Sequence, residues 1–334
     1  NTAASPAGIA VIHSLFNIGA TILLFPFANL LEKMAIFVIP DKESEMEEME
    51  EEKINPDLAR LDERFLDKPG FAMEECRSVA INMARKSQKA MNLAIDLLGE
   101  YSDKTADRVE KLENQIDQYE DALGTYLVKL SGRELSIKDS RILSVLLQCI
   151  GDFERISDHA VNIRDAAVEM HKKDLKFSEK AKQELRVFSN AIRDILDRAV
   201  MAFETGDVEL AKEVEPLEQV VDALNKEEKQ RHINRLRTGT CTIELGFILS
   251  DISTNIERAA DHCSNIAVCL LQVDEGGFDT HEYLDILKEE NSEEFQHEYM
   301  ELSERYALPE SKHTGKKEKI AKTEKMEARK DSGK

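Results

Sequence analysis

The chain has 334 residues, a formal net charge of −21, no tryptophan and few glycines or prolines. A charge of this sign argues against nucleic acid as a partner, because phosphate backbones are bound by Lys and Arg. The scarcity of turn residues and the 33% share of charged side chains argue against a β-sandwich and favour long helices. The five cysteines form no CxxC pair and are odd in number, so we expect reduced thiols in the cytosol.

Residues 1–40 are expected to be the end of a membrane domain. Residues 7–39 are almost continuously apolar, and the stretch from Ala7 to Phe25 is just long enough for a spanning helix of about 20 residues. Pro26 would kink or end that helix. A buried core helix of a soluble protein is the alternative, although few charges interrupt the run. We therefore expect the chain to be the C-terminal part of a longer membrane protein.

Residues 41–70 are predicted to be an acidic linker. The block at 41–53 reads DKESEMEEMEEEK and cannot bury a core, so it is expected to be a solvated tether. Pro56 and then Pro69-Gly70 punctuate the approach to the first long helix.

Residues 71–275 are predicted to form two antiparallel three-helix bundles, one at 71–173 and one at 174–275. Helices of about 30 residues run roughly 45 Å and pack antiparallel when short loops join them. Clusters of Gly, Ser, Thr and Asp, which stop or cap helices, break the helical pattern near Tyr101–Asp103, Ser131–Gly132, Asp174–Ser178, Thr205–Asp207 and Thr238–Thr240. The expected fold is thus all-α, with one transmembrane helix end before the bundles. Residues 276–334 are acidic and then Lys-rich, which predicts a disordered charged tail.

A repeated motif marks the two halves. Residues 152–163 read DFERISDHAVNI and residues 255–266 read NIERAADHCSNI, so both contain Glu-Arg-x-x-Asp-His-x-x-Asn-Ile. A carboxylate pair precedes each motif, at 113–117 in the first half and at 218–222 in the second. The same order at nearly the same separation indicates an internal duplication.

The spacing of these carboxylates predicts a cation site. Residues four apart on a helix share a face, so Glu154 and Asp158 project together, with Asn162 a further turn along. In a bundle, the pair on the second helix can face the pair on the third. Four converging carboxylates are costly without a cation, and such a cluster suits a hard cation or iron. The predicted metal ligands are Glu113, Asp117, Glu154, Asp158, Glu218, Asp222, Glu257 and Asp261.

Two other interpretations of the carboxylates stay open. An ExxxD pair in a chain with 66 acidic residues is often only a solvated helix face. Arg155 and Arg258 could also neutralise the pairs as salt bridges without any metal.

The histidine and cysteine of the motif are expected to contribute less. His159 and His262 lie about 140° around the helix from the glutamate of each motif, so polar histidines at the bundle edge are predicted. Cys263 has Ala160 as its counterpart in the first repeat, so a site common to both halves cannot use it.

At these residues the sequence resembles the PhoU family, which is named for the negative regulator of bacterial phosphate uptake. That family carries an ERxGD-type motif on the third helix of each bundle and E/DxxxD pairs on the second. The usual Gly before the Asp is Ser157 in the first repeat and Ala260 in the second, and both are small. The resemblance covers about Phe71 to Leu271 and implies multinuclear metal, often iron, on the bundle surface.

The preceding segments resemble bacterial sodium–phosphate cotransporters. Residues 10–17, AVIHSLFN, and the apolar run to Pro26-Phe27 are similar to the last membrane segment of that family. Residues 61–72, LDERFLDKPGFA, are similar to its LDxxxLxxPxxA linker to a PhoU-like domain. The family binds substrate through paired QSSS-type repeats, and no such motif occurs here, so the chain alone is not expected to transport phosphate.

The two resemblances imply a sodium-dependent phosphate symporter in the plasma membrane. Phosphate and the coupling ion sodium would pass through the membrane half, and the cytosolic PhoU-like domain would regulate phosphate homeostasis without being an enzyme. The alternative is a non-transporting PhoU-like regulator or docking module anchored to the membrane, including a structural homodimer. A ferritin-like di-iron enzyme is the third candidate, but it needs Glu-x-x-His on two helices, and this spacing occurs only beyond the predicted bundles, as at Glu294–His297.

Overall fold

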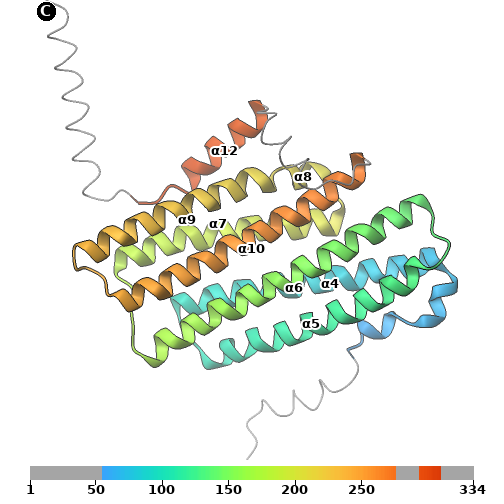
Figure 1. The fold of residues 1–334 in the computed structure, drawn as a ribbon, viewed down its shortest axis with the longest axis horizontal. Coiled ribbons are helices and arrows are strands. Elements are labelled where there is room, and N and C mark those ends of the chain that lie inside the picture. The colour runs from blue at the N-terminus through green and yellow to red at the C-terminus, as the bar shows by residue number, and fades with distance from the viewer. Residues whose placement is uncertain (1–54, 276–292, 310–334) are drawn as a thin grey trace, which may run out of the picture. The chain divides into compact units, whose positions relative to one another are not determined.

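A computed structural model of the protein describes residues 55–275 and 293–309 (Figure 1). Within these residues every regular element is a helix, which confirms the predicted all-α class. The elements are η2 (Leu58–Arg60), η3 (Glu63–Asp67), α4 (Pro69–Gly99), α5 (Asp103–Ser131), α6 (Ile137–Lys172), α7 (Glu179–Thr205), α8 (Val208–Lys212), α9 (Val214–Arg237), α10 (Ile243–Glu275) and α12 (Glu293–Arg305).

Helices α4, α5 and α6 pack against one another as the first bundle (Figure 1). Both loops between them supply helix caps, the first within the predicted cluster at Tyr101–Asp103 and the second four residues after the predicted cluster at Ser131–Gly132. Ser102 accepts a hydrogen bond from the Thr105 amide at the start of α5, and Ser136 accepts one from the Asp139 amide at the start of α6. Each hydroxyl satisfies one of the backbone donors that a helix N-terminus leaves open. Short capped loops thereby reverse the chain direction between neighbouring helices.

The second bundle consists of α7, α9 and α10, with the short helix α8 inserted after α7. Gly206 ends α7 in the left-handed conformation with φ of 70°, which costs glycine nothing. The break between α8 and α9 was not predicted, and Pro216 explains it. Its ring would clash with the carbonyl of Lys212, four residues earlier, so α-helical hydrogen bonding is interrupted there, and the Glu213 amide bonds to the Leu210 carbonyl three residues back at 3.2 Å.

The two bundles share one hydrophobic core. Helix α6 packs against α10, and α4 packs against α7. Phe153 of α6 meets Phe203 of α7 edge to face, with ring centroids 4.9 Å apart, and Ser87 of α4 donates a hydrogen bond of 2.6 Å to the Phe153 carbonyl. The described residues from Asp57 onward therefore form one compact unit, although the sequence divides into two repeats.

The segment before α4 contacts the bundle over part of the predicted linker. Leu66 is 4% exposed, and Asp62 caps η3 by accepting from the Arg64 amide. Two tyrosines of α5 hold this segment from the other side. Tyr119 donates to the Asp57 carboxylate at 2.5 Å, and Tyr126 donates to the Asp62 carbonyl at 2.9 Å. The prediction of a linker up to residue 70 is therefore wrong for residues 57–70, because its apolar side chains bury themselves against α4 and α5.

Residues 293–309 correct the prediction of a disordered tail from residue 276. Helix α12 packs against α9, and Leu302, Tyr306 and Leu308 are all at most 9% exposed. Phe295, Tyr299 and Leu302 recur at helical spacing, which is the stripe of an amphipathic helix. The acidic composition of the segment concealed this stripe.

None of the helices at 55–275 and 293–309 combines the length and the apolar character that crossing a bilayer requires. The predicted membrane segment at 7–39 and the acidic tether at 41–53 lie outside the described residues.

Candidate functional site

The duplicated motif occupies the middle of α6 and α10, the third helices of the two bundles. Its small residues pack as expected, because Ser157 and Ala260 are both 0% exposed. The Ser157 hydroxyl donates to the Glu154 carbonyl at 2.7 Å, so the extra polar group has a partner within its own helix. Close helix packing thus survives the loss of the usual glycine.

The predicted carboxylates of the first half come together across α5 and α6. Burial raises the pKa of Glu154 to about 7, and the charge and hydrogen bonding of Asp158 act in the same direction. Burial also raises the pKa of Glu113, and the charges of Asp158 and Asp117 add to that rise. These carboxylates therefore repel one another across the helix pair.

Glu120 is a further member of this cluster that the sequence analysis missed. Its pKa is raised by burial and then by the charges of Asp121 and Asp117, and its own charge raises the pKa of Glu154. The signal was available, because Glu120 follows Glu113 and Asp117 at i+7 and i+3 on the same face of α5.

The second half brings its carboxylates together across α9 and α10 in the same manner. Burial and then the charges of Asp261 and Asp222 raise the pKa of Glu257. Burial raises the pKa of Asp261 while a hydrogen bond with Glu218 lowers it. Asp222 pairs with Lys226 at 2.5 Å, a cation that the first cluster does not have at the equivalent position, where Asp121 stands. The two clusters are thus related by the duplication but differ in net charge.

The two clusters supply the donor chemistry for a cation without showing a formed coordination site. Carboxylate oxygens are what hard cations prefer, and a bound cation would relieve the repulsion that raises the pKa of Glu154. Nowhere in the described parts of the chain are three or more His, Cys, Asp or Glu residues placed so that they could hold a metal ion. Metal binding by the eight predicted ligands therefore stays a prediction.

The arginines of the motif do not form salt bridges with the motif carboxylates. Arg155 and Arg258 are exposed, and within the described residues neither forms an ion pair. Arg155 lowers the pKa of Glu154, but this effect is smaller than those of burial and of Asp158. Neutralisation by direct salt bridges, the second interpretation of the sequence, is not what this structure contains.

The motif histidines lie at the seam between the bundles, not at a bundle edge as predicted. The Nδ1 atom of His159 lies 2.9 Å from the Asn255 side-chain oxygen, and the Nδ1 atom of His262 lies 2.8 Å from an Asp152 carboxylate oxygen. The two rings stack with centroids 5.6 Å apart. Burial is the main reason that the pKa of His159 is lowered, and the charges of His262 and Arg258 lower it further. The prediction failed because α6 and α10 pack through this very face.

Two asparagines complete the seam. Asn162 donates to the Asn255 side-chain oxygen at 3.0 Å, and Asn265 donates to Asp152 at 3.3 Å. Asn162 was expected to extend the stripe of Glu154, but eight residues turn a helix about 80° past alignment, enough to reach α10. The sequence analysis missed Asp152 and Asn255, although both stand two residues before the first glutamate of their motif. The His and Asn of each motif thus bind the residue at this position in the other repeat.

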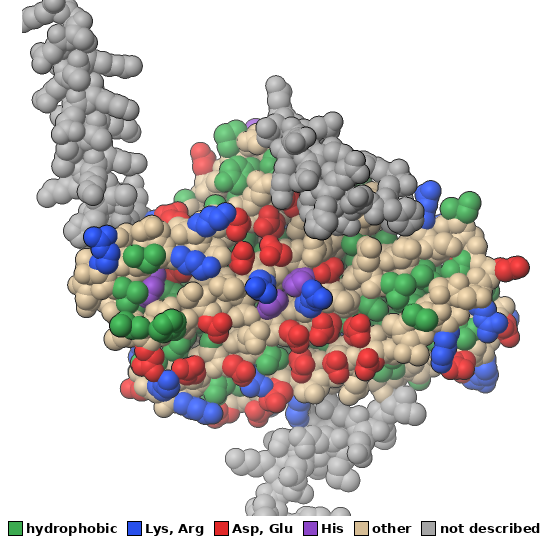
Figure 2. Space-filling view, in the orientation of Figure 1, with side chains coloured by type: hydrophobic (Ala, Val, Ile, Leu, Met, Phe, Trp, Pro, Cys, Tyr) green, Lys and Arg blue, Asp and Glu red, His purple; other side chains and the backbone are tan. Residues whose placement is uncertain are grey.

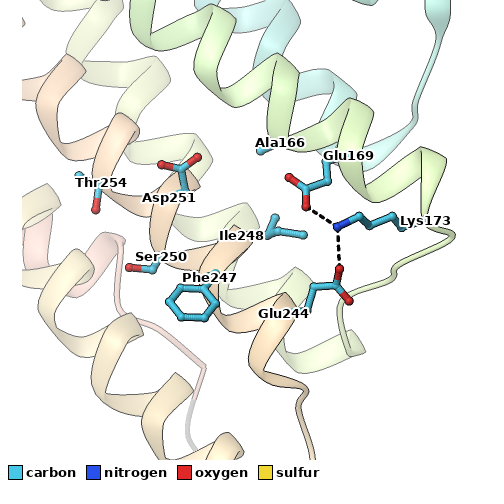
Figure 3. A pocket seen from close by; sticks show the side chains of 9 residues that line it. All are labelled: Ala166, Glu169, Lys173, Glu244, Phe247, Ile248, Ser250, Asp251 and Thr254. Carbon is cyan, nitrogen blue, oxygen red and sulfur yellow. Dashed lines mark hydrogen bonds and ion pairs between the residues drawn. The ribbon is translucent and has the colours of Figure 1, made fainter.

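An open pocket of about 530 Å³ lies on the same seam, between the C-terminal part of α6 and the N-terminal part of α10 (Figure 3). Lys173 pairs with Glu169, one turn earlier in the chain, at 2.8 Å and reaches across the pocket to Glu244 of α10 at 2.7 Å. Phe247 lines the pocket and is 74% exposed. The full lining is Ala166, Glu169, Lys173, Glu244, Phe247, Ile248, Ser250, Asp251 and Thr254.

The five cysteines are free, as the sequence predicts. Four are buried, and burial raises the pKa of the Cys76 thiol to about 12. These thiols are therefore side chains of the core and not nucleophiles.

Comparisons with known proteins agree with this architecture. The PhoU domain family matches residues 80–167 and 185–270, which together make up more than half of the chain. A PhoU homologue of Thermotoga maritima, described as a phosphate-specific transport system accessory protein, is 25% identical over 189 residues, which are 56% of this chain and 81% of the relative. The corresponding Pseudomonas aeruginosa protein is 24% identical over 219 residues, 65% of this chain and 90% of the relative.

Two crystal structures share the fold. PhoU from Pseudomonas aeruginosa superposes with a TM-score of 0.58 at 23% identity, covering 61% of this chain and 97% of that structure. The phosphate transport system regulatory protein PhoU from Streptococcus pneumoniae gives a TM-score of 0.57 at 18% identity, covering 63% and 99%. With a family match in each bundle and the repeated carboxylate motif on the third helix of each, the chain belongs to the PhoU domain family.

Proposed function

We propose that this chain is a helical regulatory module that controls phosphate transport and is not itself the transporter. The observation that carries the proposal is the family match to both bundles, at the helices that hold the duplicated carboxylates. The relatives in Thermotoga maritima and Pseudomonas aeruginosa are named as accessory proteins of phosphate-specific transport. A regulator of this kind needs a state that changes with phosphate or cation supply.

The carboxylate clusters are the proposed sensing elements. In the first cluster Glu113 and Asp117 come from α5, whereas Glu154 and Asp158 come from α6, so one cation held by all four would tie the two helices together. The second cluster would do the same for α9 and α10 through Glu218, Asp222, Glu257 and Asp261. Iron or another hard cation would supply the positive charge that offsets the repulsion among these oxygens. This chain's residues bind and orient, and no reaction step is assigned to them.

Attachment to a membrane transporter is the second proposal, and residues 1–72 favour it. The apolar run at 7–39 and the LDxxxLxxPxxA pattern at 61–72 resemble a sodium–phosphate cotransporter and its linker. On this proposal the full-length protein moves phosphate with sodium across the plasma membrane, and the helical module stands on the cytosolic side. A membrane-anchored regulator without transport activity needs the same apolar run but no sodium.

Uptake measurements separate the two proposals. Radiolabelled phosphate uptake would be compared in cells that express the full-length protein, a variant without residues 71–275, or neither. The regulatory proposal expects uptake that no longer responds to external phosphate when the module is deleted. Unchanged uptake and unchanged regulation would contradict it. The cotransporter proposal expects uptake to require sodium in both transporter-bearing strains, and uptake equal with sodium and with potassium would contradict that.

A further inference from the structure

Four basic side chains from the two repeats gather at the seam between α6 and α10. They are Arg155 and His159 on α6 and Arg258 and His262 on α10, and each pair is spaced i and i+4 and so shares one helix face. The two histidine rings stack. The charge of Arg258 on α10 lowers the pKa of His159 on α6, so the two side chains interact across the seam. In Figure 2, which shows one face of the molecule, His side chains lie in the middle with Lys and Arg side chains beside them. Asp and Glu side chains surround this group. We call these four residues the basic quartet.

The contacts at the seam determine which ring nitrogens a ligand can reach. Asn255 donates its side-chain NH₂ to the Asp251 carbonyl at 2.9 Å, which turns its side-chain oxygen toward His159. The Nδ1 atom of His159 must therefore carry the hydrogen. The Asp152 carboxylate accepts from the Nδ1 atom of His262 in the same way. In both rings the Nε2 atom is the one left to bind a ligand.

The charges favour an anion as that ligand. Arg155 and Arg258 are exposed and, within the described residues, form no ion pair, although the chain as a whole carries a net charge of −21. Two guanidinium groups that stay unpaired among so many carboxylates offer planar sets of N–H donors. A metal ion bound by the two imidazoles would be repelled by the two nearby guanidinium charges, so a metal is disfavoured at this place.

We propose that the basic quartet binds a phosphate-type oxyanion at the centre of the repeat. The arginines donate to its unprotonated oxygens, while an imidazole Nε2 accepts the hydrogen of a P–OH group. Hydrogen phosphate both donates and accepts, whereas sulfate at neutral pH only accepts, so this mixture of groups selects phosphate. Inorganic phosphate and a phosphate monoester share the chemistry. The proposal goes beyond the proposed function, since a regulator could act through its carboxylate clusters alone.

Calorimetric titration of the 334-residue chain, freed of metal by a chelator, tests the proposal with inorganic phosphate, glycerol phosphate and sulfate. We expect saturable binding of at least one phosphate compound and weaker binding of sulfate; the two phosphate titrations distinguish a free ion from an ester. Arg155→Gln and Arg258→Gln should each weaken that binding roughly ten-fold or more, because each removes charge-assisted hydrogen bonds. Arg141→Gln, an exposed arginine on the same helix α6, is the matched control and should leave binding unchanged.

Three results would overturn the proposal. The first is the absence of saturable phosphate binding by the folded, metal-free chain. The second is binding that Arg155→Gln combined with Arg258→Gln leaves unchanged, with the fold checked by circular dichroism. The third is binding that requires added metal and ignores both arginines, since the phosphate would then sit on the carboxylate clusters. All three results would leave the proposed sensing role of the clusters intact, because that role does not depend on the basic quartet.

Discussion

Ser253 of α10 donates a hydrogen bond of 2.9 Å to the Glu228 carboxylate of α9, and both residues are at most 2% exposed. Counted from the repeated motifs, their counterparts in the first bundle are the buried residues Leu123 and Ile150. A carboxyl group thus lies in the second bundle where the first has only apolar side chains. Arg235 lies 3.4 Å from Glu228, so the group is not isolated, but burial still raises its pKa to about 7.

Glu228 should make stability fall as pH rises through the neutral range. Between about pH 4.5, where this carboxyl titrates when unfolded, and its folded pKa of about 7, the folded chain holds a proton that the unfolded chain releases. Stability is therefore lost over this window as pH increases. Glu228→Gln should be more stable than the parent at pH 8 by about 1–3 kcal/mol and should flatten the profile. Urea unfolding at pH 5, 6, 7 and 8 checks this, with exposed Glu74→Gln as control; parallel profiles for parent and Glu228→Gln would refute it.

Gly246 should tolerate no side chain. A Cβ atom there would collide with the Nε2 atom of His232, which is itself only 6% exposed. Gly246→Ala should cost about 1–3 kcal/mol through overpacking. Gly151→Ala is the matched control, because a Cβ atom there meets nothing within 4 Å and alanine favours the helix. Thermal melts should move in opposite directions for the two variants, and an equal shift would show that the close approach to His232 is unimportant.

Removing two carboxylates of the first cluster should reduce a metal-dependent gain in stability to the part that the second cluster supplies. We expect ferrous or manganous ions to raise the Tm of the parent chain by ligand linkage, with about 2.7 kcal/mol gained per site at a concentration of 100 times Kd. Glu154→Gln combined with Asp158→Asn should show a smaller rise, while its metal-free Tm stays equal or increases because repulsion is relieved. Exposed Glu134→Gln is the control. A parent chain whose Tm and metal content ignore the added ions would favour solvated carboxylates.

The seam should depend on an acceptor at residue 152 and not on its charge. Asp152 accepts from both His262 and Asn265, so Asp152→Ala should destabilise the chain by about 1–3 kcal/mol. Asp152→Asn keeps an acceptor oxygen and copies Asn255 of the other repeat, so it should cost much less. Denaturant midpoints measured for both variants decide the matter. Equal losses would mean that the carboxylate charge, paired with His262, is what the seam requires.

Helix α12 should contribute to stability through its buried face. Leu302 is 3% exposed, whereas Met300, two residues earlier, is 57% exposed. Leu302→Ala should cost about 2–3 kcal/mol and Met300→Ala less than about 0.5 kcal/mol, as measured by urea unfolding. A loss of similar size for both would indicate that α12 does not pack on α9 in solution.

Much of the fold could be predicted because the chain repeats its local signals. Ser102 and Ser136 stand at helix starts and mark the loops in the sequence, and the long charged helices leave few architectures other than bundles. The break before α9 was harder, because it depends on where the ring of Pro216 would collide, and a proline three residues into a helix is also common.

The seam could not be derived from one helix at a time. Periodicity places His159 away from Glu154, which is correct, but it does not say that α10 lies on that side. Asp152 and Asn255 differ in charge, so the duplication hides their shared role as acceptors. Glu120 could have been predicted as a member of the first cluster from its helical spacing to Glu113 and Asp117. The second repeat has Lys226 where the first has Asp121, and this difference gives the two clusters different net charges. Its importance becomes clear only once the neighbours across each helix pair are known.

The two tyrosines of α5 connect the start of the domain to the helix that carries part of the first cluster. Tyr119 holds Asp57, Tyr126 holds the Asp62 backbone, and the same helix carries Glu113 and Asp117 less than two turns before Tyr119. A force applied to the chain just before Asp57 would therefore pass through these two hydrogen bonds to α5, the helix that carries two of the proposed cation ligands.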